Sequence, residues 1–388
     1  MIEFHNTKIF TDNIDSVALA QLHELDKTRV FEGQPVRIMP DVHAGAGCVI
    51  GFTAPINDKI IPNLVGVDIG CGMLCVELGK VEIDYAKLDA VIRAEVPSGR
   101  NVGKYSEEAH DLIELLHCKE HLQNRDWLDC SLGTLGGGNH FIEIDEDEDG
   151  GKYLVIHSGS RNLGKQVAEY YQDLAVKQCR STSTAEVIAT LKAQGREREI
   201  SATLKRLKEE KPALPKDLCY LQGQSMQDYL DDIQICTMFA DENRATIAYT
   251  ILSRFPVVGF FTTRHNYISD DNYIRKGAIE AKKGKRVLIP LNMRDGCIIG
   301  IGKGNEDWNY SAPHGAGRTM SRAEAKKQLR VEDFKETMAG VFSTTVSGET
   351  IDEAPFAYKP SEEIIALVQD TVEIVKIIKP VYNYKASE

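Results

Sequence analysis

Six short glycine-rich segments constrain most strongly what this chain can fold into. They read DVHAGAG, VDIGCG, LGGGNH, HSGSRNLG, GIGKGN and HGAGR, and they hold many of the 31 glycines. Glycine adopts positive φ angles and lets a ligand approach the backbone closely. One such segment alone is best explained as a tight turn. Most of the six also carry a histidine, aspartate or cysteine, which favours a shared functional site over six unrelated turns.

The segments between these loops indicate an α+β fold. Apolar strand patterns occupy 36–56, 65–78, 152–157, 257–263, 286–291 and 297–302. Helical spacing occurs over 105–122, 164–211, 224–252, 321–329 and 361–378. Because strands precede and follow the helices, the order favours α+β over a regular parallel sheet. We predict a single domain over 1–388, in which central β-sheets are flanked by helices around a deep, metal-lined cleft. A helical insertion is expected at about 164–252.

Composition and charge restrict the class of protein. No run of about 18 apolar residues and no signal-peptide pattern is present, so we expect a cytoplasmic protein. The nine cysteines lack CxxC spacing, which disfavours a zinc ribbon. A net charge of −12 argues against a non-specific nucleic-acid coat but permits a local basic groove. The acidic run from Glu143 to Asp149 is interpreted as a solvated turn.

Four histidines share a position in a loop beside a strand or a glycine run, where active-site groups are commonly found. They are His140, His157, His265 and His314. Each one alone is better explained as a hydrogen-bonded residue near the core. Asp68 and Cys71 are three positions apart, so one bend can direct both side chains toward one point. Imidazole, thiolate and carboxylate groups together can hold a transition metal.

Other motifs are weaker or absent. His117 and His121 have metal-ligand spacing on the predicted helix 105–122, but charged flanks favour a solvated face. The chain has no P-loop, and GIGKGN at 300–305 ends in asparagine and precedes no evident helix, which excludes a Rossmann loop. The SGSR segment does not lie within GxSxG, so a serine hydrolase has little support.

Taken together, the motifs resemble the RtcB family of RNA ligases. The matching segments are MPDVHAGAG (39–47), VGVDIGCG (65–72), GTLGGGNHFIE (133–143), VIHSGSRNLG (155–164), RHN (264–266), SAPHGAGRTMSR (311–322) and DEAPFAYK (352–359). The resemblance implies GTP-dependent joining of RNA 3′-phosphate or 2′,3′-cyclic phosphate ends to 5′-hydroxyl ends, in RNA repair or tRNA splicing. It also implies that His314 is the nucleophile that carries GMP, before an RNA-3′-ppG intermediate forms.

The resemblance further implies two metal positions, occupied by manganese. One would be held by Cys71, His140 and His157. The other would be held by Asp68, Cys71 and His265, so that the Cys71 thiolate bridges the two ions. Thiolate and imidazole ligands usually favour zinc or iron, so manganese rests on the resemblance alone.

The implied nucleotide contacts lie mainly around the other loops. They are Asn139, Glu143, Asn292, Gly315, Ala316, Gly317 and Lys385. The candidates for RNA or phosphate contacts are Arg161, Arg318 and Arg322, because guanidinium groups suit phosphate oxygens. Two departures from the family pattern fall here, since Asn292 and Cys297 each stand where a nucleotide-contacting serine is usual. RNA and GTP are the implied partners, and an archease-like activator is left open.

Two alternatives remain on the same scaffold. The first is a metal-dependent phosphoesterase that uses these ligands without a covalent nucleotide, for which weakened GTP binding through Asn292 and Cys297 would be the signature. The second is a non-catalytic RNA-binding or regulatory relative. A binding protein would have no need of the complete ligand set together with His314.

Overall fold

β-Sheets form the centre of the molecule. The computed structural model describes residues 1–180, 184–209 and 214–386, and within these residues the strands form three sheets. The largest sheet is antiparallel throughout. Its strands, in spatial order, are β12 (Arg286–Asn292), β13 (Gly296–Gly302), β15 (Val372–Lys385), β6 (Phe141–Glu146), β7 (Lys152–Ser158), β5 (Gly72–Gly79) and β8 (Gly259–Arg264).

The second sheet has six strands, and the third is a small pair. The six-stranded sheet has the order β1 (Ile2–Phe4), β2 (Thr7–Ile9), β3 (Val36–His43), β4 (Ile50–Pro55), β10 (Tyr273–Lys276) and β9 (Asn266–Ile268). Only β2 and β3 in it run parallel. The pair consists of β11 (Ala278–Glu280) and β14 (Ser311–Pro313). Strands β9 and β10, at 266–276, therefore join strands from the beginning of the chain.

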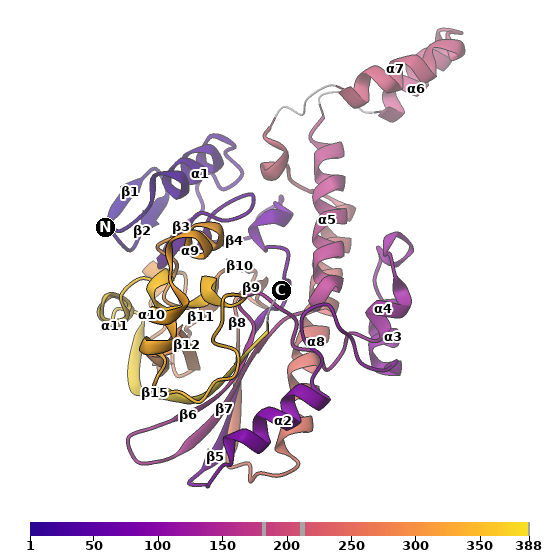
Figure 1. Ribbon diagram of the computed structural model, residues 1–388. Coiled ribbons are helices and arrows are strands. Elements are labelled where there is room, and N and C mark those ends of the chain that lie inside the picture. Colours follow the sequence, from indigo (N-terminus) through magenta and orange to yellow (C-terminus); the bar gives the residue numbers. More distant parts are fainter. Residues whose placement is uncertain (181–183, 210–213, 387–388) are drawn as a thin grey trace.

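Helices cover the sheets on the outside (Figure 1). They are α1 (Ser16–Lys27), α2 (Tyr85–Glu95), α3 (Glu107–Glu114), α4 (Arg125–Asp129), α5 (Arg161–Gln178), α6 (Thr184–Ala193), α7 (Ile200–Glu209), α8 (Gln224–Leu252), α9 (Arg322–Gln328), α10 (Val331–Thr337) and α11 (Ser361–Val368). The long helices α5 and α8 contact each other, and α6 and α7 project beyond them as a hairpin. Gly195 lies between α6 and α7.

The largest sheet buries both of its faces. On β7, Leu154 and Ile156 pack with α2 and α8, whereas Tyr153 and Val155 belong to a separate apolar cluster on the opposite face. This alternation follows from the two-residue period of a strand. The separate cluster also contains side chains of β12 and β13, and β12 contacts β8 although the two are at opposite ends of the strand order. The sheet therefore curls around this cluster.

The α+β class is confirmed, but two predicted helices are wrong in part. The helix predicted at 361–378 ends at Val368, and 372–385 is strand β15. Its β-branched run pairs with β13 and β6, and these tertiary contacts outweigh an ambiguous apolar pattern. The helix predicted at 105–122 ends at Glu114, so His117 and His121 share no helix face.

The interpretation of the acidic run as a solvated turn is also wrong for its first half. Glu143 and Asp145 lie on β6 and are buried, and the turn follows only after Glu146. Alternation places both acids on one face of β6, while Ile142 and Ile144 fill the other.

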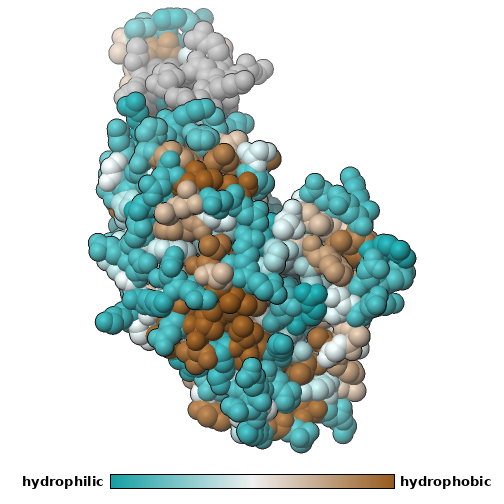
Figure 2. Space-filling view, turned by 90° about the vertical axis from the view of Figure 1, so that its left-hand side faces the viewer, coloured by the Kyte–Doolittle hydropathy of each residue, from teal (hydrophilic) through white to brown (hydrophobic). Residues whose placement is uncertain are grey.

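The outer surface shows no membrane-spanning feature among the residues that the structure describes. None of the helices within them combines the length and the apolar character needed to cross a bilayer. Figure 2 shows hydrophilic side chains over most of one face, around an area where hydrophobic side chains gather.

Candidate active site

The glycine-rich loops converge on one cavity of about 290 Å³. It is lined by every residue that the sequence predicts for the site, apart from His140 and Arg161. These two line an adjoining cavity of about 490 Å³, together with Asp68, which lines both. The structure therefore brings the predicted residues into two adjoining cavities that meet at Asp68.

Strand pairing brings the metal-capable side chains together. Cys71 directly precedes β5, which pairs with β7 and β8 on its two sides. His157 lies on β7 opposite Met73, and His265 directly follows β8. His140 directly precedes β6, whose first residue lies opposite His157. Strand pairing thus brings four residues that are far apart in the chain to the same end of strands β5, β6, β7 and β8.

The distances between these side chains are those of a compact cluster. The Cys71 Sγ lies 3.3 Å from His157 Nε2 and 3.5 Å from His140 Nε2. Cys71, His140 and His157 are buried, and their ligand atoms lie within 4.8 Å of one another. Asp68 Oδ2 is 3.0 Å from His140 Nε2, and His265 Nε2 is 3.3 Å from His157 Nε2. Asp68 and His265 therefore flank the three central donors.

The surroundings of this cluster suit a bound cation. The Nδ1 atoms of His140 and His157 are held by the backbone oxygens of Leu135 at 2.8 Å and Asn139 at 3.1 Å, which directs both Nε2 atoms inward. Burial lowers the pKa of His157 well below its usual value, so the imidazole is neutral, as a ligand must be.

Two further groups in the cluster, Asp68 and Cys71, would be stabilised by a neighbouring cation. Asp68 Oδ1 is buried and has no hydrogen-bond partner among the described residues. Burial raises the pKa of the Cys71 thiol, and the charge of Asp68 raises it further. A thiolate at this position therefore needs a neighbouring cation. The donor set fits a transition metal.

His314 lies in the same cavity, directly after β14. Its ring centroid is 4.9 Å from that of His265. Its Nδ1 lies 2.6 Å from Oδ2 of Asp41, and its backbone N–H donates to the same oxygen at 3.1 Å. Asp41 is fully buried on β3. Because Asp41 engages Nδ1, the free lone pair of the ring is on Nε2.

The sequence analysis assigned no role to Asp41 or His43. Of these two residues, His43 lines the cavity. The available signal was their place in DVHAGAG, the first of the six glycine-rich segments. Gly317 shows how tightly the two loops meet, because a Cβ there would lie 2.3 Å from the backbone oxygen of Asp41. Its φ of +75° also favours glycine.

Elsewhere in the lining of the cavity, three cations converge on one carboxylate. Glu353 is buried and pairs with Lys385 at 2.5 Å, Arg322 at 2.6 Å and Arg318 at 3.2 Å. Burial alone would raise the pKa of Glu353, but these positive charges outweigh it and lower the pKa to about 2. Lys385 also donates to the backbone oxygen of Asn139 at 3.3 Å.

Replacing Glu353 by glutamine is expected to destabilise the fold by about 3 kcal/mol, because it leaves buried cations without their counter-charge. The lowered pKa means that the carboxylate stabilises the native state above about pH 4.5 and that this contribution is lost as the pH falls toward 2. Urea unfolding at several pH values measures both effects. The exposed Glu349→Gln is the control. Equal stability of the two variants at pH 7 would contradict the expectation.

The two departures from the family pattern have different positions. Asn292 lines the cavity, and its side chain donates to Asp295 at 2.7 Å. Cys297 does not line the cavity; it is buried on β13 inside the curled sheet. Only Asn292 is therefore placed to touch a ligand in the cavity.

Arg161 lines the adjoining cavity beside Asp68. Its Nε donates to Thr134 Oγ1 and its Nη2 to the backbone oxygen of Gly99, both at 3.1 Å. A Cβ on Gly136 would lie 1.6 Å from its Nη1, so only glycine leaves room for the guanidinium. Arg100, Trp127 and Lys165 also line this cavity.

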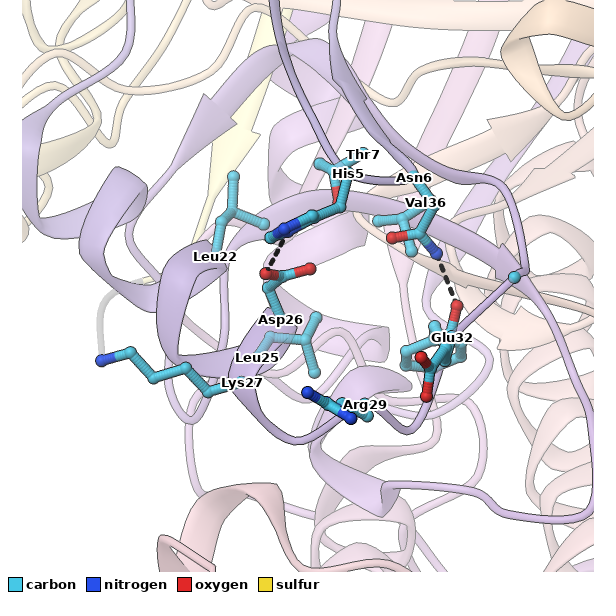
Figure 3. A pocket seen from close by; sticks show the side chains of 12 residues that line it. His5, Asn6, Thr7, Leu22, Leu25, Asp26, Lys27, Arg29, Glu32 and Val36 are labelled. Carbon is cyan, nitrogen blue, oxygen red and sulfur yellow. Dashed lines mark hydrogen bonds and ion pairs between the residues drawn. The ribbon is translucent and has the colours of Figure 1, made fainter.

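A larger cavity lies elsewhere, between the β1–β2 hairpin and α1 (Figure 3). Its volume is about 560 Å³, and no residue that the sequence predicts for the site lines it. Figure 3 shows His5 facing Asp26, with Nδ1 2.6 Å from Oδ2. The volume of a cavity therefore does not identify the candidate site in this molecule; its donor groups do.

Comparisons with known proteins agree with this placement of the motifs. A family model described as tRNA-splicing ligase RtcB matches residues 21–128 and 117–386. The RNA-splicing ligase RtcB of Escherichia coli K12 is 31% identical, and the alignment covers 97% of each chain. The tRNA-splicing ligase RtcB of Aeropyrum pernix is 28% identical over 88% of this chain and 85% of that protein. That of Archaeoglobus fulgidus is 27% identical over 85% and 83%.

Proposed function

Since the chain belongs to the RtcB family, we propose that it is an RNA ligase that uses GTP and manganese. It joins RNA 3′-phosphate or 2′,3′-cyclic phosphate ends to 5′-hydroxyl ends, in RNA repair or tRNA splicing. The observation that carries the proposal is the presence, in one cavity, of metal-capable side chains and of His314 held by a buried aspartate. A cytoplasmic location and an archease-like activator stay predictions.

The proposed metal ligands are Cys71 shared between two positions, His140 and His157 at one, and Asp68 and His265 at the other. Bound cations would offset the negative charge that develops on phosphate oxygens during transfer. Burial of the ligands keeps this electrostatic effect strong, because little water screens it.

His314 is the proposed nucleophile. Asp41 holds the proton on Nδ1, so the Nε2 lone pair is free to attack the α-phosphorus of GTP. The bond between this phosphorus and the bridging oxygen to the β-phosphate breaks, and pyrophosphate leaves. The imidazole ring gains positive charge, which the buried Asp41 carboxylate stabilises.

The RNA then takes over the GMP group. An oxygen of the RNA 3′-phosphate attacks the GMP phosphorus, the bond to Nε2 breaks, and His314 becomes neutral again. The 5′-hydroxyl oxygen of the second RNA attacks the 3′-phosphorus, loses its proton, and GMP leaves. A 2′,3′-cyclic phosphate must first be hydrolysed to a 3′-phosphate, because the cyclic end lacks the monoester that accepts GMP.

Guanine is proposed to bind near Glu143. The Oε1 atom of Glu143 accepts a hydrogen bond from the side chain of Asn383 at 2.5 Å, which leaves Oε2 of Glu143 to accept one from an N–H group of guanine. Asn139, Lys385 and Asn292 line the same part of the cavity, and the backbone of Gly315 to Gly317 lies beside His314 for the phosphates.

RNA phosphates are proposed to bind beside Arg161. The adjoining cavity offers Arg100 and Lys165 as further cations and Trp127 as a surface on which a base can stack. Arg318 and Arg322 share the charge of Glu353, and their contacts with RNA stay predictions.

Replacing Asp41 by asparagine is expected to slow the formation of the GMP adduct by about 10³-fold with the fold intact, since the amide does not fix the proton on Nδ1. Single-turnover labelling measures the rate. Asp89→Asn, another buried aspartate that lies outside the cavity, is the control. Equal slowing in both variants would rule out a positioning role.

The proposal is tested by incubating the protein with Mn²⁺ and α-labelled GTP and then denaturing it. We expect an acid-labile label on the protein, and joining of an RNA 3′-phosphate to a 5′-hydroxyl RNA. Phosphoester cleavage without label from any nucleotide would instead support the phosphoesterase. RNA binding with neither label nor cleavage would support a non-catalytic relative.

A further inference from the structure

A second group of metal-capable side chains lies inside the curled seven-stranded sheet. It consists of Glu143 and Asp145 on β6 and Cys297 on β13. One ligand atom from each lies within 4.8 Å of the others, and all three residues are buried. Asp145 and Cys297 do not line the active-site cavity, so the group extends behind it.

Asp145 is the unusual member of the group. It is fully buried, and neither of its side-chain oxygens has a hydrogen-bond partner among the described residues. Asp232, another fully buried aspartate, accepts from the backbone N–H groups of His117 and Cys118 and from the hydroxyl of Tyr171. Among the described residues, Asp41, Asp68 and Asp129 each have one buried oxygen without a hydrogen-bond partner, whereas Asp145 is the carboxylate for which both oxygens lack one.

The surroundings of Asp145 do not offer a compensating positive charge. On the same face of β6, Phe141 belongs to the apolar cluster that contains Val155 and Ile378, and none of the ion pairs found among the described residues includes Asp145. Burial raises the pKa of Asp145 well above its usual value, and the charge of Glu143 raises it further. An isolated carboxylate is too costly in such a place, so the group is either protonated or bound to a cation.

We propose that Glu143, Asp145 and Cys297 bind one zinc ion, distinct from the metal pair at Cys71. Two carboxylates and a thiolate form a ligand set that zinc accepts and that manganese, which prefers oxygen, does not favour. Cys75 belongs to the same apolar cluster and is a candidate for a fourth ligand. The group is buried, as closed structural zinc sites are, although its two carboxylates replace the cysteine and histidine ligands that are usual at such sites.

The position of this ion has a consequence for Glu143. One oxygen of Glu143 accepts from Asn383 on the neighbouring strand β15. Bound zinc would contact the Glu143 carboxylate from the side away from the active-site cavity. It would keep this carboxylate ionised where it lines the cavity. The zinc site itself does not depend on the proposed ligase activity.

Metal counting by mass spectrometry tests the site. After chelator treatment and reloading with zinc, Asp145→Asn and Cys297→Ala are expected to bind one zinc ion fewer than the wild type. Cys118→Ala is the matched control, because Cys118 is also buried beside an aspartate, but one whose oxygens are satisfied. Equal zinc content in the wild type and both variants would overturn the proposal and indicate a protonated carboxyl group.

Cobalt substitution separates this site from the active site. Both sites contain a thiolate, so each should give a sulfur-to-cobalt charge-transfer band. We expect Cys71→Ala to lose the active-site band and Cys297→Ala to lose the other, with neither variant losing both. If only the Cys71 band exists, the zinc proposal fails; if only the Cys297 band exists, the proposed metal pair fails.

The wild type provides a measurement in case the variants do not fold. Cys297 should react more slowly with an alkylating reagent when zinc is bound than after chelator treatment, as read from the labelled peptide. Cys236, a fully buried thiol of α8, should not respond to zinc. Identical labelling of Cys297 in the two states would overturn the site.

Discussion

His314→Ala is expected to abolish the covalent label from GTP and to lower RNA ligation by at least about 10⁴-fold, because His314 is the proposed carrier of the GMP. Among the described residues, no second histidine is hydrogen-bonded to the side chain of Asp41; the Nδ1 of His43 lies 3.0 Å from the backbone oxygen of Asp41 instead. Burial lowers the pKa of His43 to about 4.

Labelling with α-labelled GTP and ligation of a short RNA measure the two effects. His110→Ala is the control, because His110 is half-exposed, lies outside both cavities and pairs with Asp129. Label that persists in His314→Ala would show that another residue is the nucleophile. Peptide mapping would then identify it.

Cys71→Ala is expected to remove both metal ions proposed for the active site, since its thiolate is the proposed shared ligand. His265→Ala is expected to remove mainly one, because His140 and His157 still hold the other with Cys71. Both variants should retain the zinc ion proposed at Asp145. Ligation should fall to background in Cys71→Ala.

Counting bound metals in the purified proteins checks this second prediction. Cys118→Ala again serves as the control, since its thiol is buried outside both sites. The shared-ligand arrangement would be refuted if Cys71→Ala retained two ions with the affinity of the wild type. A loss of only one ion would show that Cys71 belongs to one position and does not bridge.

The structure brings the residues predicted from the motifs into two adjoining cavities, whereas the helices predicted from periodicity were wrong in part. The roles of these residues stay predictions. Each metal-capable residue occurs in a short motif that can be recognised from the amino-acid sequence without a structure. The helix expected over 361–378 was wrong beyond Val368, because the strand β15 is stabilised by β13 and β6, which lie far away in the chain. Periodicity alone does not distinguish such an apolar run from a helix.

Burial was the property that sequence reasoning judged least well. Asp145 stands in a run of acidic residues that is typical of a solvated turn, yet it is fully buried. Its environment depends on strands β12 and β13, which cover it in the fold but lie more than a hundred residues away in the sequence. No local pattern carries that information.

The family, the α+β class and the six glycine-rich loops with their donors were contained in the amino-acid sequence, because the identity and spacing of ligand side chains are local properties. Only the tertiary structure showed that Asp41 holds the ring of His314, a contact across 273 positions. It alone showed that neither side-chain oxygen of Asp145 has a hydrogen-bond partner among the described residues. Hydrogen bonding and desolvation depend on which surfaces meet, and that is decided when the sheets pack and curl.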